Sequence, residues 1–373
     1  MSSEPTDPVI VEAADQQMFV FRELTREDGS PGRTIAFTDT NVRPLSYQAL
    51  AEAKLHKKLT IPLEWHHSKI VDTDIGDLDK TKNYNLKAVL ESEFTSRAIG
   101  LVRGGWLPSA LAATYHRTTI LVDRNVVSQI ISRFDGGKKV GSEPDFLDLF
   151  ADQRVRINPL LFVMEGNTRE IPTPVLAREQ LEEVVAKLTV ALPSAELVVG
   201  SESLNGALGL IEDTRAGMGR RQQFLLRLAP LIAAPVSRRN MQARWDQTLS
   251  IAQDCGVQNN SLVALAALSS VAVPNGRSPA KGLLKFKVGY CDGDAYNALA
   301  DLRSLEILIN LFGYFPDEPA QLCTADKNLA LFWTGLQASG FFRTSDGVTF
   351  DMDPVEEILP GEWGEQWRSL FSV

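Results

Sequence analysis

Residues 118–123 read Thr-Thr-Ile-Leu-Val-Asp, a short apolar run that ends on a carboxylate. The β-branched residues of this run are typical of a buried β-strand. Apolar side chains then recur at helical spacing from Val126 to Ile131, so the pattern predicts a strand, an aspartate and a helix. In open α/β sheets, ligands bind beyond the carboxyl ends of the strands, and Asp123 is expected there.

A similar arrangement returns late in the chain. The pattern predicts a helix over 294–312, a strand over 320–324 and a second helix over 327–339. Between the two regions, residues 176–272 are almost wholly helical in pattern, and 262–273 are so apolar that they must be buried or form an interface. We therefore expect an α/β fold, with a parallel sheet flanked by helices and interrupted by a large helical insertion.

The rest of the chain divides around this sheet. Residues 1–113 are expected to form a mostly helical N-terminal region, with helices over 45–58, 92–101 and 107–115 and one short strand at 18–21. Residues 283–290 and 348–350 are strand-like. The expected segments are 1–113 (N-terminal region), 114–175 (first half of the sheet domain), 176–280 (helical insertion), 281–345 (second half) and 346–373 (C-terminal tail).

Composition excludes some classes of protein. No apolar run approaches the ~18–20 residues of a membrane span, and the first residues lack the pattern of a signal peptide. The three cysteines form no Cys-x-x-Cys pair, so we expect reduced thiols and a cytoplasmic protein without a membrane partner. A net charge of −9 argues against a general nucleic-acid coat, but an acidic site with local basic contacts is compatible with a nuclease.

Three carboxylates, Asp123, Asp294 and Asp326, stand where predicted strands end or helices begin, and a fourth, Asp301, lies within a predicted helix. Asp326 follows the 320–324 strand as Asp123 follows its own, while Asp294 and Asp301 are seven residues apart and share one helix face. Helix capping alone can explain Asp294, Asp326 or Asp123. Gathered together, however, these groups would repel one another without cations, and oxygen ligands are what Mg²⁺ or Mn²⁺ accept. Two such ions can activate a water and stabilise the leaving oxygen of a phosphodiester.

Three motifs resemble those of the PIN-domain nucleases. They are Leu121-Val122-Asp123-Arg124-Asn125, Val163-Met164-Glu165-Gly166-Asn167 and Thr324-Ala325-Asp326-Lys327-Asn328-Leu329. That family carries an aspartate after its first strand, a glutamate on an early helix, an aspartate on a later helix and a Thr/Ser-x-Asp after the next strand. The resemblance covers about residues 118–170 and 281–340. It implies a Mg²⁺- or Mn²⁺-dependent nuclease with RNA favoured over DNA, and the catalytic set Asp123, Glu165, Asp301 and Asp326.

The resemblance leaves the third acid open and requires an insertion. Asp301 precedes Asp326 by 25 residues and Asp294 precedes it by 32; the shorter gap suits the family, whereas Asp294 better suits the opening of a helix. The expected metal ligands therefore include both. Glu165 and Asp294 are 129 residues apart, which the helical insertion must account for. The side chains expected to position the substrate are Thr324, Asn125, Lys285 and Arg303.

Two other functions stay open. A PIN-like scaffold could bind RNA or a protein without cleaving. A haloacid-dehalogenase-like phosphatase would use Gly293-Asp294 as a later acidic motif, but Asn125 stands where its general acid belongs. The sequence does not decide whether the protein forms a homo-oligomer or takes a regulatory partner.

Overall fold

The computed structural model describes residues 19–23, 25, 28–38, 41–113, 118–141, 143–166, 169–273, 277–345 and 347–370. The chain folds into two compact units. The first comprises Met1–Arg43 and Pro62–Val89, and the second comprises Pro44–Ile61 and Leu90–Val373. The expected catalytic residues all belong to the second unit.

The first unit is built on one sheet. Its strands are β1 (Phe19–Arg22), β2 (Thr34–Thr38), β3 (Asn41–Val42), β4 (Leu59–Thr73) and β5 (Asn83–Ser92), of which β4 and β5 run past the bounds of the unit. The order is β1-β2-β4-β3, and β5 also pairs with β4. Phe37 of β2 packs edge-to-face on Trp65 of β4, with ring centroids 5.3 Å apart. An aromatic pair thus anchors the centre of this sheet.

The expectation of a mostly helical N-terminal region is wrong. Among the residues of this region that the structure describes, the α-helices are α1 (Tyr47–Glu52) and α2 (Ser109–Ala113). From Leu59 to Trp65 every second side chain is buried, which is the period of a strand and not of a helix. The helix expected over 92–101 is replaced by the end of β5 and by β6 (Ile99–Val102), and 107–115 starts in β7 (Gly105–Pro108). The short strand expected at 18–21 is present as β1, although Met18 lies outside the described residues.

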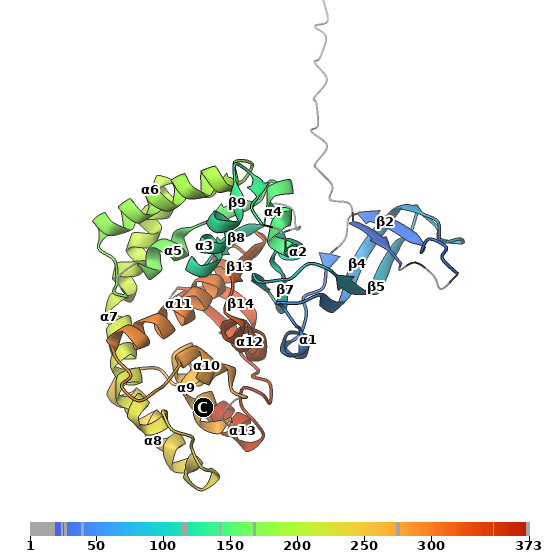
Figure 1. Ribbon diagram of the computed structural model, residues 1–373. Helices are drawn as coiled ribbons and strands as arrows, with labels where there is room; N and C mark the ends of the chain where they lie inside the picture. The colour runs from blue at the N-terminus through green and yellow to red at the C-terminus, as the bar shows by residue number, and fades with distance from the viewer. Residues whose placement is uncertain are drawn as a thin grey trace, which may run out of the picture. The chain divides into compact units, whose positions relative to one another are not determined.

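The second unit contains a six-stranded sheet in the order β12-β11-β8-β13-β6-β7, of which β7, β8 and β13 are labelled in Figure 1. The additional strands are β8 (Thr119–Val122), β11 (Arg156–Asn158), β12 (Glu196–Leu197) and β13 (Ala320–Thr324). The pairs β12·β11, β11·β8 and β8·β13 are parallel, whereas β6 and β7 form an antiparallel hairpin on the other edge of β13. The expected α/β class, with a sheet that contains parallel strands flanked by helices, is confirmed.

The helices of this unit cover the sheet and extend away from it. Besides α1 and α2 they are α3 (Arg124–Arg133), α4 (Leu149–Asp152), α5 (Leu160–Glu165), α6 (Pro174–Ala191), α7 (Ser201–Ile232), α8 (Met241–Asp254), α9 (Leu262–Ala272), α10 (Pro279–Leu284), α11 (Asp292–Tyr314), α12 (Lys327–Leu336) and α13 (Glu362–Ser369). Helices α3 and α11 contact β13, and α5 contacts β8. The chain also forms two small hairpins, β9 (Phe134–Asp135) with β10 (Lys138–Lys139) and β14 (Ser339–Thr344) with β15 (Gly347–Asp351).

The helical insertion is shorter than expected. Strand β12 falls inside 176–280 and joins the parallel sheet, so the extra helices are α7 to α10. All residues of α9 are buried, as its apolar sequence predicts. The strand expected over 283–290 is wrong, because α10 continues to Leu284 and Lys285 then adopts a left-handed conformation with φ of 53°. The C-terminal segment packs on the insertion, since Trp363 of α13 lies 4.9 Å from the ring of Trp245.

Candidate active site

Two neighbouring parallel strands deliver Asp123 and Asp326 to the same edge of the sheet. In the β8·β13 pair, Val122 lies opposite Cys323, so the residues that follow each strand stay close. The backbone N–H of Asp123 donates to the carbonyl of Cys323 at 3.1 Å, which continues the pairing by one residue. This is the edge where the carboxyl ends of parallel strands place their ligands.

Asp123 is held by its own helix and by the next strand. Its Oδ1 accepts from the backbone N–H of Val126 at 2.7 Å, which caps α3. Its Oδ2 accepts from the backbone N–H of Ala325 at 3.4 Å, and Thr324 also hydrogen-bonds the carboxylate. The capping interpretation of this residue is therefore correct, and the same bonds fix its carboxylate at the sheet edge.

Asp326 and Thr324 form the second fixed point. Oδ1 of Asp326 accepts from the backbone N–H groups of Asn328 at 2.7 Å and Leu329 at 3.1 Å, which caps α12. The fully buried Thr324 accepts from the backbone N–H of Asp326 at 3.0 Å. Thr324 thus links the two aspartates and orients them, and it lies too deep to touch a substrate.

Glu165 and Asp301 approach the two aspartates from outside the sheet. Glu165 is the last residue of α5, and Asp301 lies in the middle of α11. Both side chains are partly buried. Within the described residues, neither carboxylate has a hydrogen bond or an ion pair. Capping cannot explain these two acids, because they cap no helix.

The electrostatics of the four carboxylates are coupled. Burial raises the pKa of Asp301 well above its ordinary value, and the charges of Asp326, Glu165 and Asp123 raise it further. Burial also raises the pKa of Asp123 and of Glu165, and the charge of Asp123 adds to the rise at Glu165. Such mutual destabilisation of like charges requires that the groups lie near one another. The structure therefore brings together Asp123, Glu165, Asp301 and Asp326.

Asp294 does not join this group. Its carboxylate accepts from the backbone N–H of Cys291 at 3.1 Å and pairs with Lys287 Nζ at 2.7 Å, so it belongs to the capping box that starts α11. The hydrogen bond from Lys287 is the main reason that the pKa of Asp294 falls to about 2. Of the two candidates for the third acid, the geometry selects Asp301.

Two cavities open onto the four acids. A small one of about 20 Å³, enough for about one water, is lined by Asp123, Glu165, Asp301 and Arg303. A larger one of about 280 Å³ is lined by Glu165, Asp301 and Asp326. The other polar side chains of the larger cavity are Arg124, Arg169, Lys285, Asn125 and Asn297. Its walls are therefore polar and carry both signs of charge.

The expected substrate-positioning residues divide into two groups. Asn125 and Lys285 line the larger cavity and are exposed; Lys285 Nζ lies 3.6 Å from Asp326 Oδ2. Arg303 is only 3% exposed, and its Nη2 donates to the carbonyl of Met164. A guanidinium in that position supports the protein backbone, so the expectation that Arg303 positions a substrate does not fit its burial.

The sequence did not single out Arg124, Arg169 or Asn297. Arg124 directly follows Asp123, and its Nη1 donates to the carbonyl of Gly166 at 2.5 Å while its guanidinium lies 4.4 Å from the ring centre of Phe162. Asn297 precedes Asp301 by one helical turn, so helical spacing from a candidate acid could have found it. Nothing in the sequence around Arg169 marks it as part of the cavity.

The carboxylate oxygens of the four acids suit a divalent cation, but the side chains lie too far apart to coordinate one together. Among the residues that the structure describes, no group of three or more His, Cys, Asp or Glu side chains is close enough to hold a metal ion. The assignment of Asp123, Glu165, Asp301 and Asp326 as metal ligands therefore stays a prediction. The four groups nevertheless offer only oxygen, and Glu165 and Asp301 accept no hydrogen bond from any residue that the structure describes, although the charges of Arg124 and Arg303 near Glu165 and of Lys285 near Asp301 partly offset theirs. Hard cations such as Mg²⁺ or Mn²⁺ prefer such ligands.

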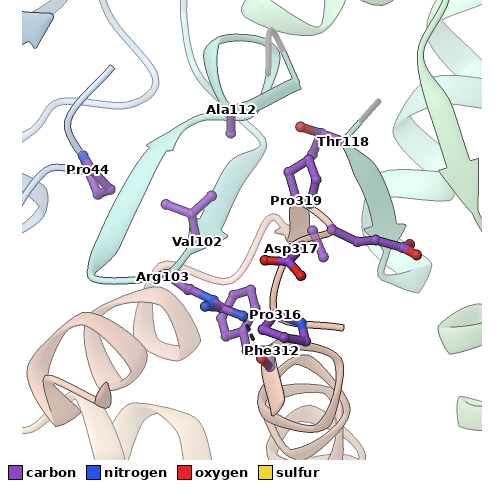
Figure 2. A pocket seen from close by; sticks show the side chains of 11 residues that line it. Pro44, Val102, Arg103, Ala112, Thr118, Phe312, Pro316, Asp317 and Pro319 are labelled. Carbon is purple, nitrogen blue, oxygen red and sulfur yellow. Dashed lines mark hydrogen bonds between the residues drawn. The ribbon is translucent and has the colours of Figure 1, made fainter. Parts of the chain in front are cut away.

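A chemically different cavity lies at the opposite ends of the same strands. It has a volume of about 280 Å³ and is lined by Thr118, just before β8, and Ala320, at the start of β13. Figure 2 shows Arg103 reaching Phe312, whose carbonyl accepts from Arg103 Nη2 at 2.5 Å; the guanidinium lies 4.9 Å from the centre of that ring. Its walls are mainly apolar, with Val102 and three prolines, and they also include the charged residues Arg103, Asp317 and Glu318.

Comparisons with models of protein families, with curated proteins and with solved structures return no match for this chain. No helix in the described part of the chain is both long and apolar enough to cross a membrane.

Proposed function

We propose that this chain is a metal-dependent nuclease that hydrolyses phosphodiester bonds. The observation that carries the proposal is the convergence of Asp123, Glu165, Asp301 and Asp326 from four separate elements onto two cavities that share Glu165 and Asp301. Packing does not account for Glu165 and Asp301, whose charge is costly at this place and compensated by no bonded partner within the described residues. A function that needs concentrated negative charge accounts for both.

The four acids would hold Mg²⁺ or Mn²⁺. A bound divalent cation lowers the pKa of a coordinated water and offsets charge on a phosphodiester. The chain itself supplies orientation. Asp123 and Asp326 are anchored by backbone N–H groups of α3 and α12, and Thr324 links them. Anchored ligands keep their geometry without reorganisation when charge develops.

Cations on the wall of the larger cavity would bind the phosphates of the substrate. Arg124, Arg169 and Lys285 all line it, together with the acids Glu165, Asp301 and Asp326. Phosphate contacts of this kind come chiefly from arginine and lysine. They supply local positive charge in a chain whose net charge is −9. We favour RNA over DNA because the resemblance to the PIN-domain nucleases implies it, and we place the protein in the cytoplasm.

A cleavage assay tests the proposal. The purified protein is incubated with labelled single-stranded RNA, single-stranded DNA and a phosphomonoester, with Mn²⁺ or with EDTA. We expect Mn²⁺-dependent cleavage of RNA by the wild type and a loss of at least about 100-fold in Asp301→Asn. The matched control is Asp294→Asn, on the same helix two turns away, whose amide can still cap α11. Equal loss in both variants, or metal-independent cleavage, would refute the assignment.

One observation favours a second candidate, a PIN-like scaffold that binds RNA or a protein without cleaving. No three acids in the described residues stand close enough to hold a metal, and two of the four have capping roles. RNA binding with no turnover in Mn²⁺ would support this candidate. The phosphatase alternative is weaker, because Asp294, its expected second motif, is committed to the ion pair with Lys287.

A further inference from the structure

Helix α5 ends at Glu165 with carbonyl groups that need partners. The last carbonyls of an α-helix have no intrahelical donor. The chain leaves the helix through Gly166, with φ of 72° and ψ of 169°, so the usual next turn is absent. The carbonyls of Met164, Glu165 and Gly166 therefore depend on donors from elsewhere in the fold.

Side chains of α11 and α3 supply these donors. Tyr296 Oη donates to the carbonyl of Glu165 at 2.7 Å. Arg303 Nη2 donates to the carbonyl of Met164, and Arg124 Nη1 donates to that of Gly166. Tyr296 and Arg303 are seven residues apart and share a face of α11, with Asp301 between them in sequence. The helix that carries one acid thus holds the backbone that carries another.

Burial makes these contacts costly to form and therefore informative. Tyr296 is 4% exposed and Arg303 is 3% exposed. Arg303 Nη1 has no hydrogen-bond partner within the described part of the chain, yet Arg303 lines the small cavity beside Asp123, Glu165 and Asp301. Burying a guanidinium with an unsatisfied donor lowers the stability of the fold, so stability alone does not explain an arginine at this position. A hydrophobic side chain would fill this space more favourably.

We propose that Tyr296 and Arg303 are positioning residues that hold the end of α5 on α11, so that Glu165 stays beside Asp301. Neither touches the substrate, and both act through the backbone at Met164 and Glu165. The proposal rests on the proposed function for its catalytic consequence, whereas the clamp between the two helices rests on the contacts alone.

Tyr296→Phe tests the clamp, because it removes one hydroxyl and keeps the ring. The control is Tyr314→Phe, at the exposed end of the same helix. Hydrogen–deuterium exchange should rise at least about fivefold in peptides that contain residues 160–166 of Tyr296→Phe and stay unchanged in the control. Unchanged exchange would overturn the clamp, whatever the protein does with nucleic acid.

The catalytic consequence is tested by a double-mutant cycle with Mn²⁺ affinity as the readout. Tyr296→Phe should weaken Mn²⁺ binding about tenfold and lower kcat with little change in KM, because the outer groups that orient a ligand have effects of this size. In the Glu165→Gln background the same change should have no further effect on Mn²⁺ binding. An equal loss in both backgrounds would overturn the positioning role.

A second variant, Arg303→Lys, tests the role of Arg303, and the behaviour of the wild type separates the clamp from the proposed nuclease function. Arg303→Lys keeps the charge but loses the fixed fork of donors, so its exchange and Mn²⁺ affinity should follow Tyr296→Phe. Wild-type behaviour in both measurements would remove Arg303 from the clamp. Absence of Mn²⁺ binding and of cleavage in the wild type, with exchange still raised in Tyr296→Phe, would refute the nuclease and leave only the clamp.

Discussion

Asp326 serves two roles that substitution can separate. Oδ1 caps α12 through two backbone N–H groups, and the charge of the side chain destabilises ionised Asp301. In Asp326→Asn the side-chain oxygen can still accept from these N–H groups, whereas in Asp326→Ala they lose their acceptor. Both variants remove the same charge, so their difference isolates the cap.

The magnitude follows from the cap. Replacing an aspartate or asparagine N-cap by alanine costs about 1 kcal/mol. Loss of the contact with Lys285 is common to both variants and small, because that lysine is exposed. We therefore expect Asp326→Ala to be about 1 kcal/mol less stable than Asp326→Asn, which corresponds to about 2 °C in Tm for a chain of this size. Asp326→Asn should match or exceed the wild type in the absence of metal, because it removes repulsion.

Urea unfolding in EDTA at pH 7.5, followed by tryptophan fluorescence, measures the difference, and equal slopes would show that the unfolded states are comparable. Both variants should lose Mn²⁺-dependent cleavage to the same extent. Equal stability of the two variants would refute the capping argument. Full activity of Asp326→Asn would remove Asp326 from the proposed catalytic set.

Three further predictions test the electrostatics, the core and the backbone. Asp301 has a folded-state pKa above its unfolded value, so the folded protein holds more protons and stability falls as pH rises through the folded pKa. In thermal melts in EDTA between pH 5 and 8, Asp301→Asn should be more stable than the wild type at the upper end, and its Tm should change less with pH. The control Asp294→Asn should be no more stable than the wild type. Leu265, fully buried in α9, should cost about 2–5 kcal/mol when replaced by alanine, measured by urea unfolding, and a cost below 1 kcal/mol would contradict its place in the core. Gly219 in α7 has open space where a Cβ would lie, so Gly219→Ala should raise stability by up to about 1 kcal/mol. A Cβ at Gly313 would lie 2.6 Å from Val348 Cγ2, so Gly313→Ala should lower stability. The opposite order of the two variants in thermal melts would contradict the packing of α11 on β15.

The strongest local patterns predicted the centre of the fold. The apolar run before Asp123 forms β8, and the strand expected over 320–324 forms β13 with its helix after it. These segments could be predicted because burial on both faces makes a short strand apolar throughout. The same logic predicted the burial of α9. The N-terminal region could not be predicted in this way, because buried and more exposed side chains alternate along β4 and β5 and no continuous apolar run marks either strand.

The part of the site that could be predicted from the sequence is the part formed by residues that directly follow a strand. Asp123 and Asp326 follow neighbouring strands, and their meeting follows from the pairing of β8 with β13. The sequence alone could not decide between Asp294 and Asp301, since only the structure shows that Lys287 forms an ion pair with Asp294. The burial of Arg303 could not be predicted, because the sequence shows which face of the helix carries the residue but not how deeply the side chain is buried. Arg169 reaches the cavity from a loop, for which periodicity carries no information.

The place of β13 in the sheet has a consequence for how the chain folds. This strand lies between β8 and β6, although about 200 residues separate it from each of them in sequence. Until residues 320–324 have been synthesised, β8 and β6 each have a strand edge without its partner. A partly synthesised chain is therefore expected to fold slowly and to be prone to aggregation. The same strand brings Thr324 and Asp326. The four acids can therefore come together only after residues 320–326 have been synthesised, and a chain truncated before them lacks Asp326.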